Sequence, residues 1–123
     1  MKYYEFSWGD LVKDQVSRAK ERGVSYGKAQ TKGELNEVLF WRWLKAMREK
    51  EGWEIYRSQA FSKADSNRVD IVAIHKGLGK CEFFDVKSSE KGALEGDPCI
   101  VGFKGEYYTL KLAYPNGDSW AII

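Results

Sequence analysis

The stretch that decides the expected fold lies at residues 69–88 and reads VDIVAIHKGLGKCEFFDVKS. It holds two runs rich in β-branched and aromatic residues, Val69 to His75 and Lys80 to Ser88. The four residues between them, Lys76-Gly77-Leu78-Gly79, contain two glycines. Two strand-like runs joined by a short glycine-containing loop are typical of an antiparallel β-hairpin.

The hairpin also predicts which residues face each other. A symmetric hairpin centred between Gly77 and Leu78 pairs positions whose numbers sum to 155, so Asp70 is expected opposite Asp85. Directly opposed residues project from the same face with Cβ atoms about 5 Å apart. Lys87 follows Asp85 by two residues, and strand alternation places it on that face too. A bulge in either strand would shift this register by one residue.

Two carboxylates held this close repel each other, so they either share a proton or hold a cation. Carboxylate oxygens suit a hard divalent ion such as Mg²⁺, and a neighbouring lysine can orient water and offset charge on a phosphoryl oxygen. The alternative is that Asp70 and Asp85 are strand-end residues facing water, with Lys87 in an ordinary salt bridge. The geometry alone does not separate these interpretations.

Two helices are expected early in the chain, ahead of a run of strands that includes the hairpin. Ser7 and Gly23 delimit a first helix over about Trp8 to Arg22, and Gly23 to Lys32 is expected to form a loop. A second helix is expected from about Lys32 to Glu51, ending at Gly52. Its apolar stripe is wide enough to pack on more than one side or to form an oligomer interface; the stripe comprises Leu35, Leu39, Trp43, Ala46 and Met47, broadened by Val38, Phe40, Trp41 and Leu44.

The remaining chain predicts further strands around polar loops. The expected strands are Trp53 to Ser58, Pro98 to Phe103, Tyr107 to Tyr114 and Ser119 to Ile123, with loops at Gln59 to Arg68 and at residues 89–97 and a hairpin turn at Pro115-Asn116-Gly117-Asp118. Helices followed by a run of strands predict an α+β fold with a mixed or antiparallel sheet. At 123 residues the chain has the length of one domain.

Composition narrows the function classes. The net charge of +2 permits nucleic-acid binding without arguing for it. Cys81 and Cys99, with His75 as the one histidine, form neither a disulfide framework nor a zinc site, and a buried free thiol is the expected state of Cys81. No apolar run approaches the roughly 20 residues that cross a bilayer, and no signal peptide is evident, so an intracellular, cytoplasmic protein in a reducing compartment is expected.

Several short strings together resemble the PD-(D/E)XK nuclease superfamily. They are Gly33-Glu34, Arg57-Ser58, Val69-Asp70-Ile71-Val72-Ala73-Ile74 and Phe84-Asp85-Val86-Lys87-Ser88-Ser89. The closest likeness within it is to the small archaeal Holliday-junction resolvases, followed by intron-encoded endonucleases of that fold. The likeness covers about residues 31–90, and it depends on the order, spacing and expected placement of the strings. Val69 stands where the name motif has proline, and the helix that usually follows the Asp-X-Lys strand is not evident in residues 90–104.

The resemblance implies a restriction-endonuclease-like α+β fold, with a central mixed sheet, an active-site β-hairpin and a flanking core helix. Residues 1–123 would form a single nuclease domain, with a nuclease core at 31–123 and a helical extension at 1–30. Asp70 and Asp85 would bind Mg²⁺, which Mn²⁺ could replace, together with the main-chain carbonyl of Val86. Lys87 would position the hydrolytic water, and Glu34 would complete the catalytic site through a metal-bound water or a second ion.

Glu34 has a second interpretation. Thr31-Lys32-Gly33-Glu34 has the capping-box pattern, in which Glu34 only satisfies backbone N–H groups at the helix start. The resemblance favours the role at the metal, and Glu37, one helical turn later, is the reserve candidate. Next to the site, an expected polar loop offers groups that usually contact phosphates, although many surface loops carry the same residue types; these candidates for nucleic-acid binding are Arg57, Ser62, Lys63, Asn67 and Arg68.

The leading hypothesis is therefore a Mg²⁺-dependent DNA endonuclease, either structure-specific or of the homing type. A homodimer or higher symmetric oligomer is expected, because a domain this small cuts two strands most simply as a pair. One alternative is a nucleic-acid-binding module of the same fold without catalysis. Another is a non-enzymatic interaction protein that uses the tryptophan-rich second helix.

Overall fold

The computed structural model describes residues 2–7, 32–58 and 68–123, except for the side chains of residues 32–34. Most of the described chain after residue 53 forms strands. In chain order the described elements are β1 (Lys2–Phe6), α3 (Lys32–Arg48) with a 3₁₀ turn (Glu49–Glu51), β2 (Glu54–Arg57), β3 (Ile71–His75), β4 (Lys80–Val86), α5 (Glu90–Leu94), β5 (Cys99–Phe103), β6 (Glu106–Thr109), β7 (Lys111–Asn116) and β8 (Ser119–Ile122).

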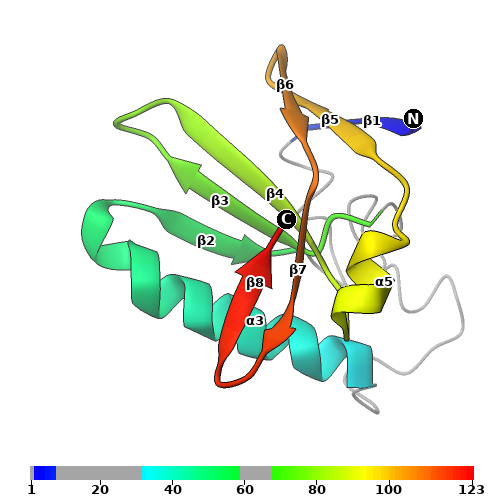
Figure 1. Ribbon diagram of the computed structural model, residues 1–123. Helices are drawn as coiled ribbons and strands as arrows, with labels where there is room; N and C mark the ends of the chain where they lie inside the picture. The colour runs from blue at the N-terminus through cyan, green and yellow to red at the C-terminus, as the bar shows by residue number, and fades with distance from the viewer. Residues whose placement is uncertain (1, 8–31, 59–67) are drawn as a thin grey trace, which may run out of the picture.

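The strands form two mixed sheets (Figure 1). The larger has the order β2-β3-β4-β7-β8, in which only β4 and β7 run parallel. The smaller has the order β1-β5-β6, in which β1 and β5 run parallel and β5 and β6 antiparallel. The α+β class is confirmed, with two mixed sheets where one central sheet was expected.

The β3–β4 hairpin lies between two hydrophobic layers, because alternate residues of its strands point to opposite faces. One layer packs α3 against the five-stranded sheet through Phe40, Leu44, Ile55, Ile71, Ala73, Phe84 and Ala113. The other packs the two sheets together through Phe6, Val69, Val72, Ile74, Phe83, Cys99, Val101, Phe103 and Leu110. A strand buried on both sides needs apolar residues at every position, which explains the continuous apolar run in β3.

Helix α3 follows the sequence prediction at its C-terminal end. It continues into a 3₁₀ turn and ends at Gly52, whose φ of 94° is the left-handed conformation that glycine adopts without strain. Its buried face centres on Phe40, whose ring packs edge-on against Phe84 and Trp120. Four members of the predicted stripe instead face solvent, namely Leu35, Leu39, Ala46 and Met47.

Two expected elements differ in the structure. The predicted loop at residues 89–97 contains the short helix α5, which starts where the Ser89 hydroxyl accepts a hydrogen bond from the Gly92 N–H. The predicted strand from Tyr107 to Tyr114 is divided at Leu110 into β6 and β7, which belong to different sheets. Leu110 is buried and donates its N–H to the Cys99 carbonyl, so the chain crosses between the sheets at this residue.

The N-terminal residues also differ from expectation. Residues 1–30 were expected to form a helical extension, but β1 occupies Lys2–Phe6 and is the parallel neighbour of β5. Phe6 is buried in the layer between the sheets. The predicted helix from Trp8 to Arg22 and the loop that follows it to residue 31 lie outside the described residues.

Both predicted hairpins are confirmed. Strands β3 and β4 pair in the expected register from His75–Lys80 to Ile71–Phe84. Strands β7 and β8 end in the pair Asn116–Ser119, and Gly117 adopts a φ of 64° in the turn. In the described part of the chain, no helix is long and apolar enough to cross a membrane.

Candidate functional site

The candidate site lies at the open end of the β3–β4 hairpin, where a β-bulge changes the pairing. The ladder ends at the pair Ile71–Phe84, yet the Asp70 N–H also donates to the Phe84 carbonyl at 2.8 Å. Two residues of one strand therefore face a single residue of the other, which is the arrangement of a bulge. The bulge replaces the direct Asp70–Asp85 pair of the symmetric hairpin, although both carboxyls still border one site.

Asp70 is a buried carboxyl among other acids. Its side chain accepts a hydrogen bond from the Val86 N–H at 2.7 Å, and the residue is 8% exposed. Burial and the nearby Glu37 and Asp85 carboxylates raise the pKa of Asp70 far above its ordinary value, although the Val86 N–H acts in the opposite direction. These effects favour the protonated form of the Asp70 carboxyl, and a bound cation would favour the ionised form.

Glu37, on α3, is the neighbouring acid that raises the pKa of Asp70 most. The two side chains are hydrogen-bonded, and Glu37 lies 3.9 Å from Arg57 Nη2 through its Oε2. The side chain of Glu34, the first-choice candidate, lies outside the described residues. Helical spacing could have favoured Glu37, because it shares a face with Phe40 and Leu44, the residues that α3 buries.

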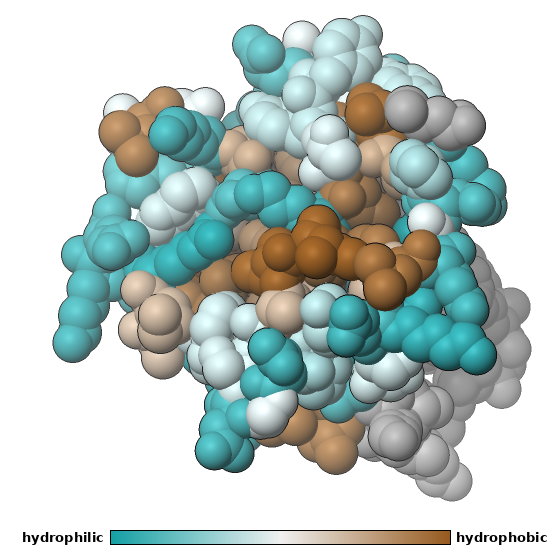
Figure 2. Space-filling view, viewed as in Figure 1, coloured by the Kyte–Doolittle hydropathy of each residue, from teal (hydrophilic) through white to brown (hydrophobic). Residues whose placement is uncertain are grey.

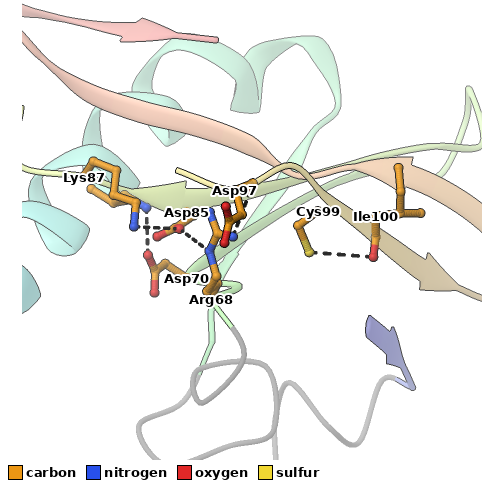
Figure 3. Close-up of polar contacts among 8 residues, drawn as sticks. Arg68, Asp70, Asp85, Lys87, Asp97, Cys99 and Ile100 are labelled. Atoms are coloured by element: carbon orange, nitrogen blue, oxygen red, sulfur yellow. Dashed lines mark hydrogen bonds and ion pairs between the residues drawn. The ribbon is translucent and has the colours of Figure 1, made fainter. Parts of the chain in front are cut away.

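Asp85 is compensated by two cations (Figure 3). It is 5% exposed, and its Oδ2 lies 3.0 Å from Arg68 Nε and 3.2 Å from Lys87 Nζ. Lys87 is held beyond the end of β4 by its N–H, which donates to the Ala113 carbonyl at 2.7 Å. Burial of a carboxylate costs free energy unless it is paired, and these two contacts supply the pairing.

The structure places the predicted nucleic-acid contacts only in part. Arg57 and Arg68 both face carboxylates of the site, and Arg68 Nη1 donates in addition to the Asp97 carbonyl at 2.9 Å. No sequence pattern indicated the contact between Arg68 and Asp97, which lie 29 residues apart along the chain. The three other predicted contacts, Ser62, Lys63 and Asn67, lie outside the described residues.

The carboxylate oxygens of the site are of the ligand type that a hard divalent cation prefers. Mg²⁺ is usually held by one or two carboxylates, with water and substrate oxygens completing the shell. Glu37 and Asp70 are hydrogen-bonded acids, and a cation between them would replace the proton they hold and remove their repulsion. Among the described residues, no group of three or more histidine, cysteine, aspartate or glutamate side chains is arranged to hold a metal ion. Asp85 is instead turned toward Arg68 and Lys87. For Val86, the structure shows the N–H bound to Asp70.

The chain matches no protein-family model, and no curated protein or solved structure matches it.

Proposed function

We propose that this protein is a metal-dependent nuclease that hydrolyses phosphodiester bonds in DNA. The observation that carries the proposal is the meeting of three acids and a lysine, from α3 and both hairpin strands, at one end of the hairpin. Glu37 and Asp70 share a hydrogen bond, and Lys87 contacts Asp85. The PD-(D/E)XK resemblance supports the same assignment, with Glu37 in the role that the sequence first gave to Glu34.

Each residue has a distinct task in this proposal. Asp70 and Glu37 would bind Mg²⁺, with Asp85 as the further ligand once it turns from its cations. The bound ion supplies Lewis-acid polarisation of a phosphate oxygen and a more acidic water. Lys87 has an ammonium group and no free lone pair, so it donates hydrogen bonds to water or to phosphate oxygens. Its charge opposes the negative charge that grows on phosphorus-bound oxygens during hydrolysis.

A cleavage assay tests the proposal directly. Four-way junctions, linear duplex, single-stranded DNA and RNA are incubated with the protein in Mg²⁺, Mn²⁺ or EDTA. We expect metal-dependent cuts in at least one DNA substrate, and their loss in Asp70→Asn. The matched control is Asp97→Asn, which makes the same change on an exposed residue and leaves the main-chain carbonyl that accepts from Arg68 in place. Metal-dependent binding of DNA with no cleavage on any substrate would instead identify a catalytically silent binding module.

A symmetric dimer is the assembly that we propose for two-strand cleavage. The exposed α3 residues Leu35, Leu39 and Met47 provide one apolar surface for it. Figure 2 shows a second, a hydrophobic band across the face on which α5 and the end of β8 lie in Figure 1. Leu94 of α5 and Ile123, after β8, are both exposed. Light scattering of the wild type and of Leu39→Glu would show whether α3 forms the interface. A Leu39→Glu protein that remained a dimer would exclude it.

A further inference from the structure

Arg68 combines two unfavourable features beside the candidate site. Its backbone has a φ of 75°, a left-handed conformation that residues with a Cβ adopt rarely. Its Nη2 is buried and has no hydrogen-bond partner among the described residues. Unfavourable backbone conformations and unpartnered buried polar groups concentrate at functional sites, where the surrounding structure enforces them.

Two other guanidinium atoms of Arg68 are held by polar contacts. Nε lies 3.0 Å from Asp85 Oδ2, and Nη1 donates to the Asp97 carbonyl at 2.9 Å. The first contact joins the segment before β3 to β4, and the second joins it to the segment between α5 and β5. The guanidinium of Arg68 is therefore held at Nε and at Nη1, and Nε faces the buried carboxylate of Asp85.

The ion pair between Arg68 and Asp85 affects metal binding, because Asp85 Oδ2 is paired with both Arg68 and Lys87. A divalent ion that used Asp85 would have to compete with these cations for the carboxylate and would also be repelled by them. Lys87 has a flexible stem and a single charged atom, so it can move slightly and remain beside the ion. Arg68 is the more rigid competitor, since its planar group is anchored to Asp97 as well.

We propose that Arg68 is a positioning residue that competes with the divalent cation for Asp85. The proposal rests on the metal-dependent function argued above. It predicts that Arg68 sets how tightly the site binds its ion, and that its side chain releases Asp85 when the ion enters. A purely structural Arg68 predicts the opposite effect, because loss of the contacts with Asp85 and Asp97 would loosen the site and weaken binding.

The direct test is Mn²⁺ binding to the full chain by isothermal titration calorimetry. Arg68→Gln keeps a hydrogen-bond donor but removes the charge, and it should bind Mn²⁺ on the order of tenfold more tightly, as expected from removing one nearby like charge. Arg68→Lys keeps the charge but places it on a flexible stem without the planar anchor to Asp97, so its Mn²⁺ affinity should lie between those of the wild type and Arg68→Gln. The matched control is Lys91→Gln, which removes one charge from an 84% exposed side chain of α5.

A second measurement uses the unmodified protein and does not depend on the variants folding. Titration with Mg²⁺ should shift the NMR resonance of the Arg68 Nε–H, because Asp85 exchanges that contact for the ion. An unshifted resonance at saturation would overturn the proposal, and so would Arg68→Gln that binds Mn²⁺ no more tightly than Lys91→Gln. Wild-type binding that depends on Asp70 would leave the proposed metal site intact in both cases. Absence of Mn²⁺ binding in all four proteins would refute the metal-dependent function and this inference together.

Discussion

Replacement of Asp70 by asparagine should stabilise the protein in the absence of metal. Asp70 is 8% exposed and lies among other acids that raise its pKa. The folded protein therefore keeps a proton on Asp70 at a pH where the unfolded chain has released it. Asparagine is neutral at every pH, its carbonyl can still accept from the Val86 N–H, and its amide can donate to Glu37, so the variant avoids this cost.

The magnitude follows from the distance between pH 7 and the ordinary aspartate pKa. Keeping the proton on Asp70 lowers the free energy of unfolding by about 1.4 kcal/mol for each pH unit in that interval. The largest stabilisation that Asp70→Asn could give is therefore about 4 kcal/mol. Asparagine still buries a polar group of its own, so the variant gains only part of this ceiling. We therefore expect Asp70→Asn to raise the free energy of unfolding by about 1–3 kcal/mol at pH 7.

The pH dependence fixes the sign. Because the folded pKa of Asp70 is raised, its favourable contribution is complete below the ordinary value near 3.8 and is lost as pH rises toward the folded value. Wild-type stability should thus fall relative to Asp70→Asn between pH 5 and pH 8.

Urea unfolding at several pH values measures these differences, and Asp97→Asn serves as the matched exposed control. Mn²⁺ should raise the melting temperature of the wild type and of the control, and should raise that of Asp70→Asn much less. A wild type that gains stability relative to Asp70→Asn from pH 5 to pH 8 would refute the account of Asp70. Equal Mn²⁺ shifts in the two proteins would refute its role as a ligand.

Three further substitutions test other parts of the structure. Lys87→Ala should reduce cleavage on the order of a hundredfold, as for loss of one electrostatic stabiliser, and should weaken DNA binding only modestly. Cleavage rates and gel-shift affinities measure these two effects separately. Equal losses of cleavage and binding would mean that Lys87 only anchors a phosphate. Glu82→Gln should cost about 1–3 kcal/mol at pH 7, because it leaves Arg48 and Lys111 without their shared carboxylate. Arg48 and Lys111 lower the pKa of Glu82 despite its burial, so this contribution should fade as acid denaturation curves pass below the ordinary value of 4.5. Phe40→Ala should cost about 3–5 kcal/mol in urea melts, since it empties the centre of the layer under α3.

The sequence alone predicted the structural features that depend on residues close together in the chain. The register of the β3–β4 hairpin follows from alternation and a short turn, and the end of α3 follows from Gly52, so both were predicted. The same holds for the turn at Gly117. In each of these the decisive hydrogen bonds join residues close in the chain, and the side-chain period reports them directly.

Only the tertiary structure decided the features that join distant segments. The parallel pairing of β1 with β5 and the crossing at Leu110 depend on which sheet buries each apolar residue, and local pattern carries no record of that choice. The candidate site has the same origin. The bulge at Asp70, the approach of Glu37 from α3 and the contact of Arg68 with Asp97 arise where separate elements pack together. The hairpin could therefore be predicted to carry Asp70, Asp85 and Lys87, whereas the partner of each carboxylate was set by long-range packing.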